Sequence, residues 1–151
     1  MKIRLFFFGK ENEITAREKE LIKRIGFRAK LKLIALSQAG IKDDLKAKKE
    51  ESDKFMNKIS DQDFVIAFDE RGSEKDSLEF SAWLKEKLVD QGEVVFVMGG
   101  AHGLHEDVLS RANVKLRFGK MIWTRNLFRN MALEQLYRAL EIDGGGNFHK
   151  A

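Results

Sequence analysis

The stretch that decides the fold is Val94-Val95-Phe96-Val97-Met98-Gly99-Gly100-Ala101-His102-Gly103. Its five consecutive apolar residues are typical of a strand that is covered on both faces of a parallel sheet. The glycines that follow permit a tight turn and let a ligand approach the backbone, because no Cβ stands in the way. Ligands of α/β proteins bind at such carboxyl ends of strands. The spacing is GGxxG and not the GxGxxG of dinucleotide-binding domains, so a plain strand-to-helix turn remains an equal interpretation of this stretch alone.

Alternating strand and helix patterns extend outward from this stretch. Four further runs have strand character, at residues 3–8, 31–36, 64–68 and 114–118. Helical patterns cover residues 13–25, 43–59, 104–112 and 126–142, and Ser77 is predicted to cap another helix that reaches residue 88. The alternation predicts an α/β domain, with a mainly parallel sheet and flanking helices. No linker or repeat divides the chain, so residues 1–151 are expected to form one domain.

The composition excludes some classes of protein. The 151 residues include no cysteine, so the sequence predicts no disulfide and no thiolate metal site, and we expect no metal. The longest apolar run near the N-terminus, residues 5–8, is too short for a signal-peptide core or for a membrane span. We therefore expect a cytoplasmic protein that is not embedded in a membrane.

The positive charge is concentrated in one region. The net charge is only +4, but no acidic residue lies between Asp107 and Glu134. This region contains six cations: Arg111, Lys115, Arg117, Lys120, Arg125 and Arg129. Such a cluster favours binding to the phosphates of a nucleic acid. The lysines of residues 41–58 alternate with acids, which indicates a solvated helix face and not a nucleic-acid arm.

Other polar segments leave alternatives open. Asp69, directly after a strand, could hold a ribose or a metal, or it could simply pair with Arg71. In the loop after residue 118, Trp123 could stack on a base, but the core or the wall of an apolar pocket is favoured for the apolar residues there. His149 is a candidate base near neutral pH, whereas solvated loop positions are favoured for His102 and His105.

Three segments together resemble the SPOUT-class ribosomal RNA large subunit methyltransferase H family. They are residues 64–72, residues 95–104, and residues 120–139 closed by Phe148-His149-Lys150. The resemblance is in good register from residue 64 onward, and the residues before it match in pattern only. It implies a SPOUT fold with a C-terminal trefoil knot, a homodimer, and S-adenosylmethionine as cofactor. It also implies that the substrate is 23S rRNA, methylated on N3 of a pseudouridine in the assembled ribosome.

The resemblance also implies roles for individual residues. The cofactor-binding positions fall on Phe68, Gly100, Phe118, Gly119, Lys120, Met121, Ile122 and Trp123. His149 is the candidate catalytic base, with Arg129 as a partner for a phosphate or an oxyanion. The RNA-binding candidates are Arg111, Lys115, Arg117, Arg125, Arg138 and Lys150. Tyr137 is expected to pack, and Glu134 could pair with Arg138 one helical turn on.

The chain departs from the family pattern at a few positions. Thr124-Arg125 stands where the family usually has a proline-histidine pair. Phe68 replaces a leucine, and Phe148 replaces a tyrosine. These departures support an alternative, an RNA- or ribosome-binding SPOUT-like protein with a degenerate cofactor pocket. A third hypothesis, a small-nucleotide-binding α/β protein, rests on the glycine loop alone.

Overall fold

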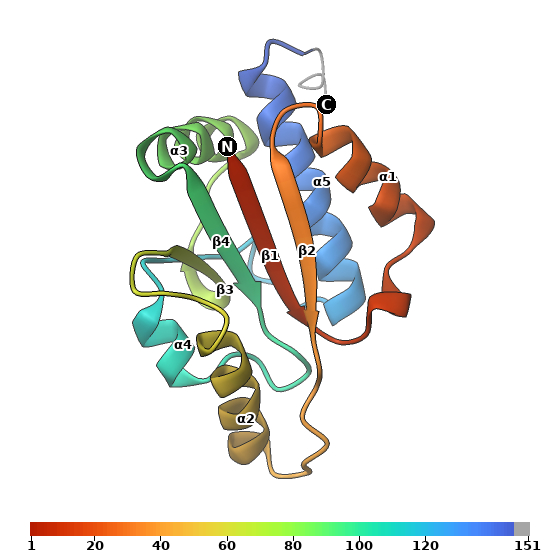
Figure 1. Cartoon of the computed structure of the whole chain (residues 1–151), viewed down its shortest axis with the longest axis vertical. Helices are drawn as coiled ribbons and strands as arrows, with labels where there is room; N and C mark the ends of the chain where they lie inside the picture. The colour runs from red at the N-terminus through yellow and green to blue at the C-terminus, as the bar shows by residue number, and fades with distance from the viewer. Residues whose placement is uncertain (147–151) are drawn as a thin grey trace.

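The structure, a computed structural model, describes residues 1–146. Five strands form one sheet in the order β2-β1-β4-β3-β5, and every neighbouring pair is parallel (Figure 1). The prediction of an α/β fold with a mainly parallel sheet is therefore confirmed. The strands are β1 (Lys2–Phe8), β2 (Lys30–Leu36), β3 (Phe64–Ser73), β4 (Glu93–Met98) and β5 (Val114–Leu116).

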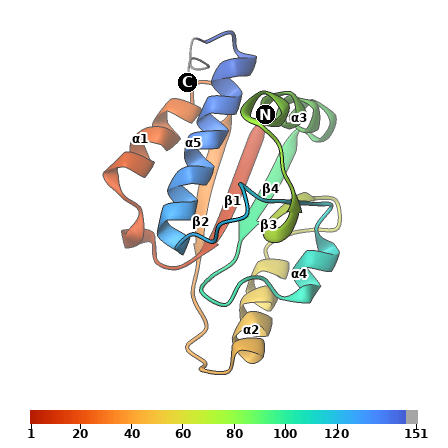
Figure 2. The same cartoon turned by 180° about the vertical axis from the view of Figure 1, so that it is seen from behind.

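Helices cover both faces of the sheet (Figures 1 and 2). One face carries α1 (Ala16–Ile25), α3 (Ser77–Gln91) and α5 (Arg125–Asp143), and the other carries α2 (Asp44–Met56) and α4 (Glu106–Arg111). A short 3-10 helix, Glu11–Glu13, links β1 to α1. Within residues 1–146, no helix has the length and apolar character that crossing a membrane requires.

The two cores explain the continuous apolar runs in the central strands, residues 5–8 of β1 and 94–98 of β4. In β1, Leu5 and Phe7 face the core under α1, α3 and α5, while Phe6 and Phe8 face the core under α2 and α4. The ring of Phe55 from α2 packs edge-on against Phe6, with 5.2 Å between centroids. Since successive side chains of a strand point to opposite faces, a strand with helices on both sides has no position left for a polar residue.

The structure differs from the sequence prediction at some element ends. Asp76, and not Ser77, caps α3, because its carboxylate accepts the backbone N–H of Glu79. β5 ends at Leu116 and does not reach residue 118. Here the pairing of β3 with β5 shifts register, and Gly72 approaches so closely that a Cβ would lie 2.6 Å from the Leu116 carbonyl carbon. The chain therefore leaves the sheet early and starts the loop that borders the functional site.

Candidate functional site

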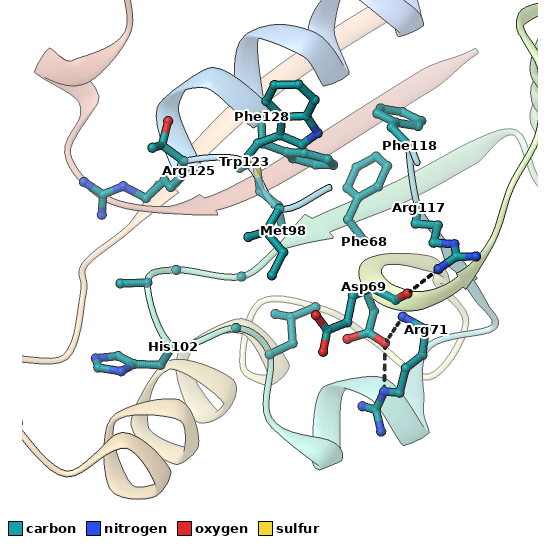
Figure 3. A pocket seen from close by; sticks show the side chains of 18 of the residues that line it. Phe68, Asp69, Arg71, Met98, His102, Arg117, Phe118, Trp123, Arg125 and Phe128 are labelled. Atoms are coloured by element: carbon teal, nitrogen blue, oxygen red, sulfur yellow. Dashed lines mark hydrogen bonds and ion pairs between the residues drawn. The ribbon is translucent and has the colours of Figure 1, made fainter. Parts of the chain in front are cut away.

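A cavity of about 760 Å³ opens at the carboxyl ends of β3, β4 and β5 (Figure 3). Its floor includes Phe68 from β3, Met98 from β4 and Leu116 from β5. The walls come from the glycine loop after β4 and from the segment of residues 117–124. Both the place and the volume are those of a small-molecule site in an open α/β sheet.

An aromatic group forms the apolar part of the cavity. Phe68 lies 5.2 Å from Phe118 and 5.1 Å from Phe128 between ring centroids, and Phe118 and Phe128 stack at 5.6 Å (Figure 3). Phe128 comes from the first turn of α5. The sequence analysis missed it, because only the tertiary structure brings this turn to the end of β3. The three rings offer a flat apolar surface suited to a heterocycle or an aliphatic chain.

The glycine loop presents its backbone to the cavity. Gly103 has a φ of +79°, and its N–H donates to the carbonyl of Gly100 at 3.0 Å. Gly99 has no room for a side chain, because a Cβ would lie 2.6 Å from the carbonyl carbon of Gly103. The turn therefore requires glycine for its own geometry, and it also leaves peptide groups open to a ligand.

The two histidines of this loop have partners. The Nδ1 atom of His102 lies 2.7 Å from a carboxylate oxygen of Asp44, which connects the loop to α2. The Nδ1 atom of His105 accepts the backbone N–H of Asp107 and so caps α4. The interpretation of both histidines as merely solvated loop residues was therefore wrong.

All eight predicted cofactor-binding residues line this one cavity: Phe68, Gly100, Phe118, Gly119, Lys120, Met121, Ile122 and Trp123. Met121 and Ile122 are nevertheless 77% and 84% exposed, so they border the opening and do not belong to the core. Trp123 is also exposed. A core position for these three residues, one alternative from the sequence, is excluded.

The basic stretch of residues 111–129 is mostly engaged in internal contacts. Arg111 donates to the carbonyls of Ser60 and Asp63, both at 2.8 Å. Arg117 and Arg125 line the cavity, but Arg117 pairs with Glu74 at 2.9 Å. Internal contacts therefore occupy several of the cations predicted to bind RNA, and their RNA-binding role stays a prediction.

Arg125 connects the cavity lining to the end of β1 and to the 3-10 helix that follows it. Its guanidinium donates to the Phe8 carbonyl at 3.0 Å and pairs with Glu13 at 3.2 Å. Of the six cations in the stretch, Lys115 and Lys120 have side chains with neither an ion pair nor a hydrogen bond within the described residues, and of these two only Lys120 lines the cavity. The acids that neutralise the stretch come from distant segments of the chain.

Arg129 does not reach the cavity. It is fully buried between α1 and α5, and it donates to both carboxylate oxygens of Glu18, at 2.6 and 3.0 Å. Its guanidinium also lies over the ring of Phe7, 4.5 Å from the centroid. A role as a phosphate or oxyanion partner does not fit this geometry, and the structure corrects that prediction.

The ion pair with Arg129 also lowers the pKa of Glu18. Burial alone would raise the pKa of Glu18, but the hydrogen bonds from Arg129 and Thr15 and the charge of Arg129 outweigh it, so the pKa lies below its ordinary value. The carboxylate is thereby held in its charged form. Arg129 and Glu18 are an internal ion pair that joins two helices.

The other residues singled out in the sequence do not share one location. Asp69 accepts both the backbone N–H and the Nε–H of Arg71 at 3.1 Å, so the pairing alternative is confirmed. Arg138 lies on α5 away from the cavity, 3.9 Å from Glu134. Tyr137 packs against the core, as predicted. His149 and Lys150 lie outside the described residues.

Two further residues line the cavity without having been predicted from the sequence. Gln38 follows β2, and Lys48 lies on α2, in the mixed-charge segment interpreted as a solvated helix face. Lys48 is partly buried, and no ion pair within residues 1–146 involves it. No local signal distinguishes it from its neighbouring lysines. Within the same residues, no group of histidine and acidic side chains is placed to hold a metal ion.

Comparisons with known proteins agree with this fold. A family described as "Predicted SPOUT methyltransferase" matches residues 1–149. Proteins named "Ribosomal RNA large subunit methyltransferase H" from Clostridium tetani and Clostridium botulinum are 36% and 38% identical, over 99% of this chain and 100% of theirs. A crystal structure of a probable methyltransferase from Bordetella pertussis superposes with a TM-score of 0.60 at 15% identity, covering 91% of this chain and 95% of that one. The chain therefore belongs to the SPOUT methyltransferase family.

Proposed function

We propose that this protein is an S-adenosylmethionine-dependent methyltransferase of large-subunit ribosomal RNA. The observation that carries the proposal is the convergence of all eight predicted cofactor-binding residues on one cavity at the carboxyl ends of the strands. The names of the relatives support the RNA substrate. The proposal has four more detailed parts: N3 of a pseudouridine in 23S rRNA as the target, the assembled ribosome as the form of the substrate, a cytoplasmic location, and the trefoil knot. These four rest on the resemblance of the sequence to the methyltransferase H family.

The residues of the cavity suit the cofactor. Phe68, Phe118 and Phe128 form an apolar wall for a heterocycle, while the glycine loop exposes peptide groups that can read polar edges. The bound cofactor supplies a methyl group that is activated by a sulfonium. The protein then contributes mainly orientation, which aligns the ring nitrogen of the nucleotide with the methyl carbon.

The reaction needs a base. A bound cofactor would supply the methyl group and keep the electron pair of the C–S bond as a neutral thioether, and a residue of the chain would have to take the proton of the ring nitrogen. We propose His149 for this role, because a histidine titrates near neutral pH. Arg129 is not part of the proposal, since Glu18 and the Phe7 ring surround its guanidinium.

Two lysines are placed to meet the phosphates of the RNA at the opening of the cavity. Lys48 comes from α2 and Lys120 from the segment of residues 117–124, and neither has an ion-pair partner within residues 1–146. Cations without internal partners can neutralise phosphates at no structural cost. Arg117 and Arg125 line the same cavity, and we keep them as secondary candidates for contacts to the RNA phosphates.

Replacing Lys48 by alanine is expected to raise the KM for ribosomes about 5- to 10-fold with little change in kcat, and to lower the salt slope of binding by about 1. Lys46→Ala is the matched control, since Lys46 is an exposed lysine on the same helix that does not line the cavity. Methylation of ribosomes at several salt concentrations measures both effects. Equal behaviour of the two variants would remove Lys48 from the RNA-binding surface.

An exposed apolar surface supports the homodimer. Met121 and Ile122 border the cavity, and Leu127 follows them at the start of α5, 48% exposed. Contiguous exposed apolar residues at a site usually mark an interaction surface. We propose that a second copy of the chain covers them, which would also narrow the opening of the cavity.

Transfer of a labelled methyl group to ribosomes tests the function directly. Incorporation into 23S rRNA, absent from ribosomes that already carry the modification, is the expected result. Ribosome binding without methyl transfer would favour the alternative, a binding protein with a degenerate pocket. Digestion of the labelled RNA to nucleosides identifies the modified base.

A further inference from the structure

A buried carboxylate lies behind the glycine loop. Glu51 on α2 is 3% exposed, and its Oε2 accepts the backbone N–H of Ala39 at 3.2 Å. Its Oε1 is also buried and accepts no hydrogen bond within the described residues. A buried carboxylate oxygen without a partner is costly, so the position calls for a compensating donor or positive charge.

The neighbours of Glu51 belong to the cavity. A Cβ on Gly100 would lie 3.3 Å from Oε1 and 3.5 Å from Oε2, so the carboxylate lies directly against this glycine. Gly100 itself lines the cavity, as do Gln38, next to the Ala39 that binds Oε2, and Lys48, one helical turn before Glu51. The carboxylate is therefore separated from the cavity by backbone and not by a layer of side chains.

Within residues 1–146, no ion pair involves the carboxylate of Glu51. The cations nearest in sequence have other partners, because Lys49 pairs with Asp53 and Asp107, and Lys54 pairs with Glu50. Lys48 forms no ion pair with Glu51, although both lie on the same side of α2. His102, on the glycine loop, pairs with Asp44. An unpaired acid next to a ligand cavity favours a cationic ligand.

We propose that Glu51 is a positioning residue that makes the cavity prefer the sulfonium of S-adenosylmethionine to the neutral thioether of the by-product, S-adenosylhomocysteine. The inference rests on the proposed function. The two molecules share their adenosine, ammonium and carboxylate groups and differ in the methyl group and the charge on sulfur. A fixed negative charge therefore stabilises the cofactor before transfer and loses this attraction afterwards, which assists release of the by-product.

The test compares the affinities for the two molecules. The substitution Glu51→Gln is expected to lower the ratio of Kd for S-adenosylhomocysteine to Kd for S-adenosylmethionine about 10-fold, because the neutral side chain no longer attracts the positive sulfur. Calorimetric titration with each molecule measures the two Kd values. Glutamine keeps the shape and an oxygen that can accept the Ala39 N–H. Asp53→Asn is the matched control, because it removes one negative charge from an exposed position on the same helix and should leave the ratio unchanged.

The outcomes separate this inference from the proposed function. Loss of affinity for both molecules by the same factor would show that Glu51 only supports the loop, and it would overturn the inference. Binding of neither molecule by the wild-type chain would instead contradict the proposed cofactor. If Glu51→Gln does not fold, Glu51→Asp provides the test. Aspartate keeps the negative charge, but its shorter side chain places the charge farther from the glycine loop, so the ratio should fall by less than 10-fold. An unchanged ratio there would also overturn the inference.

Discussion

Replacing Gly100 by arginine should weaken binding of S-adenosylmethionine by at least about 100-fold, because a ligand pocket loses most of its contacts when a side chain occupies it. Gly100 lines the cavity, and a Cβ there would already lie 3.3 Å from Oε1 of Glu51 and 3.5 Å from the Phe8 Cβ. A long side chain at this position therefore has to displace the glycine loop or extend into the cavity, and either change disrupts the site. Calorimetric titration of the purified protein measures the effect, with about one cofactor per chain expected for the wild type.

Gly40→Arg is the matched control for this variant. Gly40 lies in the exposed segment before α2, and a Cβ there would meet no atom within 4 Å. It should bind the cofactor as the wild type does. If Gly100→Arg folds and still binds with wild-type affinity, the cofactor does not occupy this cavity. If the wild type does not bind at millimolar concentration in the absence of ribosomes, the RNA-binding alternative becomes the leading hypothesis.

Arg129→Leu should lower the free energy of unfolding by about 3–5 kcal/mol, the usual cost of removing one partner of a buried ion pair. The change leaves the Glu18 carboxylate buried, with only the hydrogen bonds of Thr15. It also removes the hydrogen bond from Arg129 to the Glu13 carbonyl, which holds the segment before α1. Urea unfolding, followed by circular dichroism, measures the loss.

Arg24→Leu is the control for this second prediction, because Arg24 pairs with Glu20 on the exposed face of α1. An exposed pair of this kind contributes little to stability. Equal stability losses in the two variants would contradict the structural role of Arg129. Loss of methyl transfer by Arg129→Leu without any loss of stability would restore it as a catalytic candidate.

The same ion pair predicts a pH dependence. The folded-state pKa of Glu18 is lowered from 4.5, so the unfolded chain takes up its proton at a higher pH than the folded chain does. The contribution of Glu18 to stability is therefore complete above the unfolded value and is lost as the pH falls through the folded one. Wild-type stability should decline below about pH 4.5, and this part of the decline should be absent from Arg129→Leu.

The sequence was sufficient for the strands and helices, apart from some of their ends, and for the loop that lines the cavity. Continuous apolar runs such as residues 94–98 identify strands without reference to the rest of the chain, because burial on both faces leaves no polar position. The eight predicted cofactor positions came from the family resemblance, and six of them lie in the contiguous loop of residues 118–123. A contiguous loop stays together in any fold, so its residues were expected to share one site.

The sequence could not determine the roles of most charged residues, since these depend on partners far away in the chain. Arg129 and Glu18 are separated by more than a hundred positions, yet they form the buried ion pair between α1 and α5. The acid-free stretch suggested free cations for the same reason, because Glu13 and Glu74 are distant in sequence and adjacent in space.

The sequence by itself determined that this chain is a parallel α/β protein with a glycine loop after residue 98. Only the tertiary structure decided which side chains complete the cavity there, since Phe128 and Lys48 reach it from α5 and α2. The physical reason is the range of the interactions. Burial and backbone turns are local and leave periodic patterns, whereas ion pairs and cavity walls join residues that only the packing of helices onto the sheet brings together.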